Sequence, residues 1–356
     1  MSTDFADLHD ELRSVAVELL EKETGATVPV SLLARAGWTG LEVPDHLGGA
    51  GATFCETAVI CEEIGRAAAS TGYFGGLLAV GALTALPPGA VRDGLLSGIA
   101  EGTSTVSVAL SADGNGGTAL PFGITPASAG WRAAGRARFV VDATADQVLL
   151  LAEDPAGFPV IVVVPADTAG LTVQPQPVVD ETRSLAEVLA DDVTVGAAAV
   201  LRFADDGHAP VRALTARAET AIACDSLGIA EAMLARTVAY VGVREQFGRP
   251  IGSFQAVKHA CADMLVLISV GQQLVRSAVD GVAEQRDDAG LAASKAKAYT
   301  TEAAVEIAGR AMQLHGGIGY TWESGVHGYL KRATLNRALF GSPATHRRRI
   351  AQQYRV

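Results

Sequence analysis

The order in which residue patterns change along this chain limits its fold more than any single motif does. Near the N-terminus, leucine and valine recur at helical spacing between residues 8 and 20, with charged residues between them. From about residue 105 the pattern changes to short β-branched or aliphatic runs between turn residues, such as residues 160–164. From residue 211 it is helical again. This order predicts an α+β chain.

The predicted boundaries follow these changes of pattern. We expect a helical domain over residues 1–104, a middle β domain over 105–204 and a C-terminal helical bundle over 205–356. The expected helices of the bundle cover about 211–243, 254–283, 288–314, 324–337 and 343–353.

Charge and cysteine content argue against several classes of function. The 356 residues carry a formal net charge of −11, and an acidic surface does not favour binding to nucleic acid. The cysteines form no CxxC pair and no cluster with metal-ligand spacing, so we expect no metal site and free thiols in a reducing compartment. The four are Cys55, Cys61, Cys224 and Cys261.

No membrane segment is expected. The N-terminus is acidic and lacks the basic and then apolar pattern of a signal peptide. Residues 67–91 carry no charge and are long enough to span a bilayer, but the pairs Gly75-Gly76 and Pro87-Pro88 interrupt them. We therefore expect a buried helix with loops there, in a soluble, cytoplasmic protein.

Residues 244–259 are the most informative motif. They read Arg-Glu-Gln-Phe-Gly-Arg-Pro-Ile-Gly-Ser-Phe-Gln-Ala-Val-Lys-His. Arg244 offers the planar fork of donors that suits a phosphate. Gly248-Arg249-Pro250 breaks the helix, and Phe254-Gln255 is suited to contact with a flat heterocycle. A second block, Gln-Leu-His-Gly-Gly-Ile-Gly-Tyr, covers residues 313–320.

These two blocks resemble the flavin-contacting segments of the acyl-CoA dehydrogenase family. Residues 37–51 and 61–66 also resemble the family's N-terminal segments, so the resemblance covers essentially the whole chain. It implies an N-terminal helical domain, a middle β-barrel and a C-terminal four-helix bundle. It also implies FAD as the cofactor, an acyl-CoA thioester as the substrate of an α,β-dehydrogenation, and an electron-transfer flavoprotein as the expected acceptor.

The same resemblance assigns contacts to FAD. Arg244 corresponds to the family's arginine that contacts the FAD diphosphate across a subunit interface, so we expect a homo- or hetero-oligomer with a related subunit. The glycines of the second block allow close approach to the dinucleotide. The other contacts implied for this part of FAD are Phe247, Gln255, Gln313, Gly316 and Gly317.

The chain departs from the family's pattern around the flavin ring. Where the family has a Thr-Glu-Pro-type loop, residues 110–117 keep one hydroxyl placed to bond the ring, that of Ser111. Where the family has a strand hydroxyl that meets flavin N5, this chain has Val141, whose side chain cannot donate a hydrogen bond. Phe139 remains able to pack against the ring. We expect this chain to hold the ring poorly.

The usual catalytic base is missing as well. Many members of the family carry a glutamate in a stretch that corresponds to residues 338–342, where this chain has Phe340, which cannot take a proton. Other branches place the base on the preceding long helix, at the position of Ala218. Asp225 lies within about 20° of Ala218 around a helix and is the candidate base, with a structural role as the alternative. Glu219 is expected on a solvated face.

Three functions remain open from the sequence. The first is a base-lacking subunit of an α2β2 acyl-CoA dehydrogenase whose partner carries the base, as the intact Arg244 segment and the altered ring segment indicate. Alternatively it is a self-sufficient homomeric dehydrogenase that uses Asp225. A third reading is a scaffold subunit without cofactor.

Overall fold

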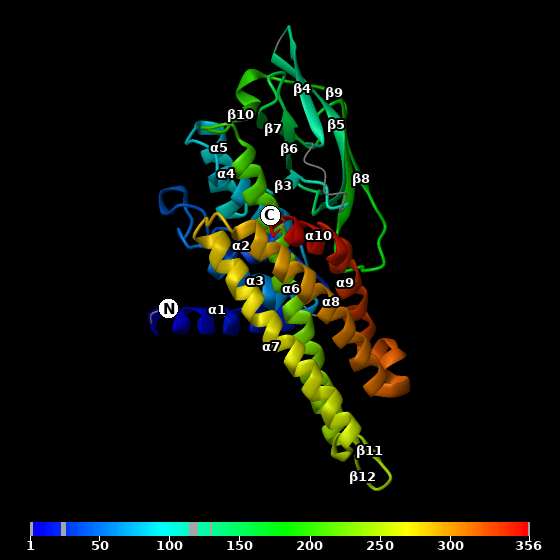
Figure 1. The fold of residues 1–356 in the computed structure, drawn as a ribbon. Coiled ribbons are helices and arrows are strands. Elements are labelled where there is room, and N and C mark those ends of the chain that lie inside the picture. The colour runs from blue at the N-terminus through cyan, green and yellow to red at the C-terminus, as the bar shows by residue number, and fades with distance from the viewer. Residues whose placement is uncertain (1–2, 23–25, 114–119, 129, 355–356) are drawn as a thin grey trace.

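The N-terminal segment of the protein is helical, as predicted. The computed structural model describes residues 3–22, 26–113, 120–128 and 130–354 (Figure 1). The short strands β1 and β2 pair in parallel beside the helices. The elements are α1 (Thr3–Lys22), β1 (Thr27–Val28), α2 (Val30–Arg35), η1 (Asp45–Leu47), α3 (Phe54–Ala67), β2 (Ser70–Thr71), α4 (Tyr73–Thr84) and α5 (Ala90–Glu101).

The sequence explains where α3 begins and why α4 is buried. Helix α3 begins at a capping box, in which the Thr53 hydroxyl accepts from the backbone N–H of Cys55 and the Glu56 carboxylate accepts from the N–H of Thr53 at 2.8 Å. Helix α4 lies in the uncharged stretch 67–91. Its 12 residues, most of them buried, confirm the prediction of a buried helix with loops.

The middle segment forms an eight-stranded sheet. Its strands are β3 (Val106–Ala109), β4 (Phe122–Ala127), β5 (Gly130–Val141), β6 (Gln147–Glu153), β7 (Pro159–Pro165), β8 (Leu171–Pro175), β9 (Leu185–Val195) and β10 (Val200–Arg202), the last preceded by the turn η2 (Ala197–Ala199). Their order is β10-β7-β6-β4-β5-β9-β8, with β3 paired to β6 in parallel.

The sheet has two edges in the described part of the chain. No pairing there joins β8 to β10, and a barrel requires pairing all the way round. The α+β class is confirmed, with this middle sheet between the helical N- and C-terminal segments as the resemblance implies. Strand β6 shows why the segment is so apolar: Leu149 and Leu151 face the core shared with the helices, whereas Val148 and Leu150 face a second core within the sheet.

The C-terminal segment is the predicted helical bundle, and each helix begins and ends within three residues of its predicted position. The helices are α6 (His208–Val243), α7 (Gln255–Ala283), α8 (Ala289–His315), α9 (Val326–Ala338) and α10 (Pro343–Gln353). Shorter elements connect them, namely β11 (Glu245–Gln246), β12 (Arg249–Pro250), η3 (Ile251–Ser253), η4 (Gly316–Tyr320) and η5 (Trp322–Ser324).

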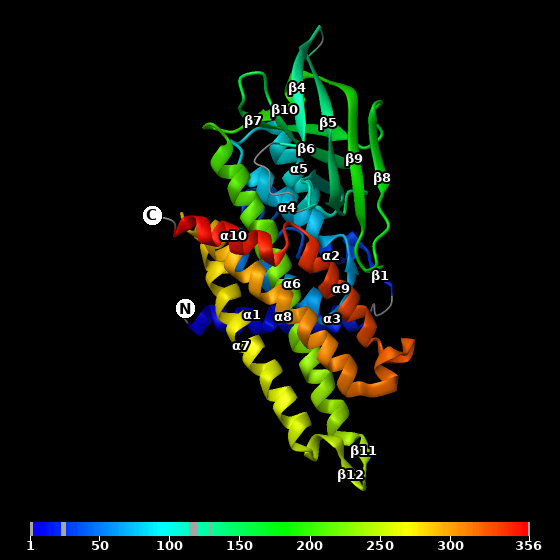
Figure 2. The same cartoon turned by 45° about the vertical axis from the view of Figure 1, so that its right-hand side comes forward.

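Helix α6 is the axis of the molecule. Its 36 residues span about 54 Å, from the sheet to the β11–β12 hairpin at the opposite end (Figures 1 and 2). It is long and apolar enough to cross a bilayer by length and composition, but half of that apolar stretch is buried inside the protein. It packs against α3, α7 and α8, as the central helix of a folded core does.

Candidate cofactor and substrate site

The segment after α6 forms a projecting hairpin. Phe247 and Gly248 connect β11 to β12 and both have positive φ, 53° and 73°, as a tight two-residue turn requires. Phe247 is 92% exposed, and its ring meets that of Phe254 edge to face at 6.1 Å. Arg244 directly follows α6, and its carbonyl accepts from the backbone N–H of Ile251 at 2.7 Å, which closes the base of the hairpin; its side chain is exposed.

The second motif lies at the same end of the bundle. Helix α8 ends at His315, whose ring stacks on Tyr240 of α6 with centroids 4.5 Å apart. Gly316 follows with φ 62°, and a Cβ at Gly316 or Gly317 would meet nothing within 4 Å. The two glycines and Gln313 are exposed, so the backbone here is open to a ligand.

We call these residues the hairpin-side group. The structure brings all of them to one end of the bundle, because α7 begins directly after the hairpin and α8 runs back to meet it. All are exposed in the single chain, which leaves an arginine and an accessible glycine backbone free to bind an anionic group such as a diphosphate. The group comprises Arg244, Phe247, Gln255, Gln313, Gly316 and Gly317.

A second set of predicted residues lies beside the sheet. The Ser111 hydroxyl accepts from the backbone N–H of Arg138 at 3.1 Å, and Phe139 sits with φ 53° where the β5–β9 register shifts. The N–H of Phe340 donates to the Ala112 carbonyl at 3.0 Å, which joins the α9–α10 turn to the same place. We call Ser111, Phe139 and Phe340 the ring-side group. Residues 114–119 of the neighbouring loop lie outside the described residues.

The ring-side group fits a flavin only in part. Among the described residues the Ser111 hydroxyl accepts a hydrogen bond but donates none, whereas the backbone N–H of Phe139 donates to the Gln176 amide oxygen at 2.7 Å. Val141 is 3% exposed and packs in the helix-facing core. The hairpin-side group therefore suits the diphosphate of a dinucleotide better than this group suits its ring.

Phe340 belongs to the core and offers no base. It is 6% exposed, and the following Gly341 has φ 109°. The Gly341 carbonyl accepts from the fully buried ammonium of Lys297 at 2.9 Å. The turn where the resembled family often carries a glutamate is therefore held here by core packing of Phe340 and by the hydrogen bond from the buried Lys297.

Asp225 is placed as a structural residue, which is a correction to its selection as the candidate base. It is 0% exposed, and its carboxylate binds Arg332, Asn336 and Arg183, the last at 2.9 Å. Burial by itself raises the pKa of this carboxyl, but Arg183 and Arg332 hold it below its usual value. Because both oxygens are engaged and the group is a weak base, Asp225 is poorly suited to remove a proton from a substrate.

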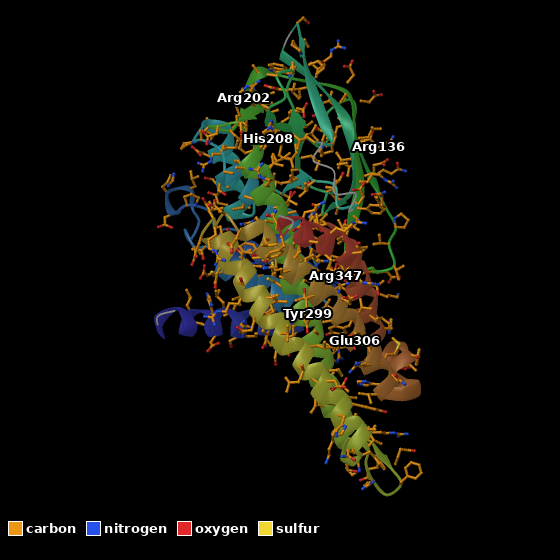
Figure 3. All side chains as sticks on the ribbon, in the orientation of Figure 1. Arg136, Arg202, His208, Tyr299, Glu306 and Arg347 are labelled. Carbon is orange, nitrogen blue, oxygen red and sulfur yellow. The ribbon has the colours of Figure 1, made fainter. Side chains whose placement is uncertain are left out.

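Glu219 is buried rather than solvated, contrary to expectation. It is 2% exposed and accepts from Arg349 of α10 at 2.6 Å, while the neighbouring Arg347 points outward and pairs with Glu302 (Figure 3). Burial raises the pKa of Glu219 to about 7 and lowers the pKa of Lys297 to about 7. Glu219 and Lys297 are both buried, and Lys297 contacts the turn that carries Phe340 through the Gly341 carbonyl.

No sequence pattern points to Lys297 or Arg183 as buried charges. Lys297 lies on an Ala-rich helix and Arg183 in the turn before β9, and nothing local marks either as buried. Across the described ranges, no group of three or more His, Cys, Asp or Glu residues is arranged to hold a metal ion. All four cysteines are free thiols, as predicted.

Comparison with known proteins agrees with this arrangement. The family model for the acyl-CoA dehydrogenase N-terminal domain matches residues 4–103, and that for the C-terminal domain matches residues 206–354. Acyl-CoA dehydrogenase IpdE2 of Mycolicibacterium smegmatis is 30% identical over 319 residues, which are 90% of this chain and 85% of that protein.

Solved structures of this fold are also similar. A steroid acyl-CoA dehydrogenase variant, Tcur3481-Tcur3483, superposes with a TM-score of 0.87 at 28% identity, over 98% of this chain and 97% of the other. Butyryl-CoA dehydrogenase of Megasphaera elsdenii superposes with a TM-score of 0.85 at 23% identity, over 99% of each chain, and this shows the shared fold. FAD is the cofactor of these enzymes as a family. The chain belongs to the acyl-CoA dehydrogenase family.

Proposed function

We propose that this chain is the base-lacking subunit of a cytoplasmic, FAD-dependent acyl-CoA dehydrogenase that works beside a related subunit in an α2β2 assembly. One observation carries the proposal. The hairpin-side group is complete and open, whereas the ring-side group of the same chain has Phe340, packed into the core, in place of a base. The chain is thus equipped to complete a neighbour's cofactor site better than its own.

The geometry of α6 supports a shared site. The hairpin-side group lies at one end of α6, a helix about 54 Å long, and the ring-side group lies back along the molecule, beside strand β5. This separation supports a site in which a ligand held by Arg244 of one chain meets the ring-side group of another chain. Arg244 and the accessible glycine backbone at Gly316 and Gly317 would hold FAD, which would supply a hydride acceptor for the β-carbon of the acyl group, while a base of the partner subunit would take the α-proton.

The surface near the hairpin also favours a partner. Val243, Phe247, Ile318 and Tyr320 are 77%, 92%, 46% and 72% exposed, although large apolar side chains on a lone surface are costly to leave in water. Val243 and Phe247 lie next to Arg244 in the chain, so a partner subunit that covers them would also bury the arginine beside the dinucleotide bound to that partner. Burial strengthens the interaction of a guanidinium with a diphosphate.

The similar proteins support the same substrate class. IpdE2 is named an acyl-CoA dehydrogenase, and the Tcur3481-Tcur3483 enzyme is named a steroid acyl-CoA dehydrogenase. We extend this to an acyl-CoA thioester from fatty acid or steroid degradation as the substrate here, with an electron-transfer flavoprotein as the acceptor.

Co-expression with a related subunit tests the proposal. The flavin absorbance per chain is measured for this chain alone, for the pair, and for pairs that carry Arg244→Ala or the control Arg286→Ala. Arg286 is an arginine beyond the far end of α7, paired with Asp288. We expect little flavin on the lone chain, flavin and thioester-dependent bleaching in the pair, loss of flavin with Arg244→Ala, and no change with Arg286→Ala.

Two results would contradict the proposal. Full flavin content and turnover by the lone chain would identify a self-sufficient homomeric enzyme. A colourless protein, both alone and with the related subunit, would identify a scaffold without cofactor.

A further inference from the structure

A cavity of about 460 Å³ lies where α1, α3, α6 and α7 come together (Figure 1). This volume is within the range of small-molecule sites. Gln272 and Gln273 on its α7 side are exposed, so the cavity is open to solvent. No hairpin-side or ring-side residue lines it, and Gln272 lies about 26 Å along α7 from the start of that helix at Gln255. The cavity is therefore separate from the proposed cofactor site.

Three carboxylates share two guanidinium groups at one end of the cavity. Arg13 of α1 donates to Glu62 at 2.7 Å and to Glu63 at 3.2 Å. Arg66 binds both of these acids as well, and it also binds Glu231 of α6. Burial raises the pKa of Glu62 in spite of Arg13, and the charge of Glu231 raises it further. Negative charge is therefore in excess at this end.

The opposite end of the cavity is also acidic. Asp280 of α7 lines it, and in the described part of the chain its carboxylate makes no hydrogen bond or ion pair. Cys55 of α3 lines the same end. Burial raises the pKa of the Cys55 thiol, and the charges of Glu56, Asp280 and Glu284 raise it further. The pKa of this thiol therefore indicates a negative potential here.

Two basic side chains offset the acids of the Asp280 end only in part. His9 of α1 binds Glu56 at 2.9 Å, and Arg276 lies one helical turn before Asp280 on α7. Even with both of them charged, three carboxylates face two cations, because Glu284 adds to Glu56 and Asp280. The cavity as a whole therefore favours a positively charged ligand over a neutral or an anionic one.

The walls between the two acidic ends are mostly apolar. Gln272 donates to Glu231 at 2.7 Å and so marks one end, and Asp280 follows it by eight residues, which is about 12 Å along α7. The polar side chains on this stretch, Gln273 and Arg276, are exposed. The other side chains that line it are Ala58, Val59, Cys224, Leu227, Val275 and Val279.

We propose that this cavity binds an aliphatic diamine, with one ammonium group at Glu62 and Glu231, the other at Asp280, and the methylene chain against the apolar walls. An ammonium donates strong, charge-assisted hydrogen bonds to carboxylates. If each end takes up about 3 Å for a hydrogen bond, about 6 Å is left between the two nitrogens, which suits about four methylene groups. The inference does not depend on the proposed function, because a single chain forms the cavity and binding there needs no flavin.

Isothermal titration calorimetry of the full-length chain with 1,4-diaminobutane tests the site. We expect saturable binding of one diamine per chain. The matched ligand is 1-aminobutane, which has the same carbon chain but can satisfy only one acidic end, and it should bind at least tenfold more weakly. Butanedioate, which has the same length and the opposite charge, should not bind.

Asp280→Asn is the matching change in the protein. It should weaken the binding of 1,4-diaminobutane at least fivefold and leave the thermal stability of the unliganded chain unchanged, because the Asp280 carboxylate has no hydrogen-bond partner to lose among the described residues. Asp263→Asn is the control, since Asp263 is an exposed acid of the same helix that does not line the cavity, and it should leave binding unchanged.

Three results would each overturn the inference. The first is the absence of saturable binding of 1,4-diaminobutane. The second is equal affinity for 1-aminobutane, which would indicate only a general attraction of amines to an acidic protein. The third is unaltered affinity in folded Asp280→Asn. If that variant does not fold, the comparison of the two amines on the unmodified chain still decides.

Discussion

Two nitrogens of the Arg332 guanidinium bind the two carboxylate oxygens of Asp225, at 2.6 and 3.1 Å, and neither side chain is exposed to solvent. The Nη1 of Arg332 donates to the Ala69 carbonyl at 2.7 Å and to the Thr182 hydroxyl at 2.8 Å. One guanidinium therefore ties α9 to α6, to the N-terminal helices and to the turn before β9. Removal of either partner leaves the other charge buried and unpaired.

Asp225→Asn is expected to lower the free energy of unfolding by about 3–5 kcal/mol, because Arg332 and Arg183 lose their counter-charge. Urea unfolding measures this. Asp263→Asn is the control, since Asp263 is an exposed partner of Arg310 at 3.4 Å and its loss should cost less than about 0.5 kcal/mol. A stable Asp225→Asn protein that binds flavin but no longer supports its bleaching by substrate would instead identify Asp225 as the base.

Gly341→Ala is expected to destabilise the protein by about 1–3 kcal/mol, since φ is 109° and the new Cβ would lie 2.9 Å from Nε2 of His346. Gly328→Ala on α9 is the matched control. Its Cβ would meet nothing within 4 Å, and alanine favours a helix by about 0.8–1.0 kcal/mol, so this variant should be slightly more stable. Thermal unfolding of the two variants side by side checks the expected opposite signs.

The stability of the chain should rise with pH above 7 because of Lys297. Its pKa falls from the ordinary 10.5 to about 7 on burial, so between these values the unfolded chain holds a proton that the folded chain has lost. Stability then increases by up to about 1.4 kcal/mol per pH unit. Lys297→Met should abolish this rise, whereas Lys295→Met, at a partly exposed neighbour, should keep it. Urea unfolding at pH 7.5 and 9.5 measures the difference; equal slopes in all three proteins would contradict the prediction.

Phe247→Asn should weaken association without weakening the fold. Asparagine accepts the positive φ of 53° at this position more readily than phenylalanine does, so the free energy of unfolding of the lone chain should stay within about 0.5 kcal/mol or increase. The same change removes an apolar ring that is 92% exposed. Light scattering after size-exclusion chromatography should show that a smaller fraction of the Phe247→Asn chain than of the unmodified chain is associated with the related subunit. An unaltered fraction would mean that the hairpin tip is not part of the subunit contact.

Sequence patterns predict most of the helical fold. The five bundle helices match their predicted bounds closely. Helix α7 buries one face from Met264 to Val279, whereas α6 is buried on every side from Ala216 to Ala230. Helix α5 and strands β4 and β8 were not predicted. Strand β8 is short and mostly exposed, so its residues show little of the alternation between apolar and polar side chains that marks a half-buried strand. In α5 only three of 12 residues are buried, which leaves a weak periodic signal.

The environment of the candidate acids was not predictable in the same way. Asp225 is neutralised by Arg183 and Arg332, which come from the turn before β9 and from α9, and Glu219 by Arg349 from α10. Such pairings join positions more than forty residues apart, so no local pattern reveals them. The motif at Arg244 is different. Its hairpin geometry is local, and the sequence break at Gly248 predicted its position.

The length of α6 has a consequence for how such a protein can change over time. It keeps the arginine hairpin of a chain far from that chain's own Phe340 turn. In the paired assembly proposed above, each pocket would therefore draw one half from each subunit, and a substitution at the Phe340 turn would inactivate one pocket and leave the other intact. A subunit in such a pair could lose its own base and still be required, because its partner would depend on the hairpin that it supplies.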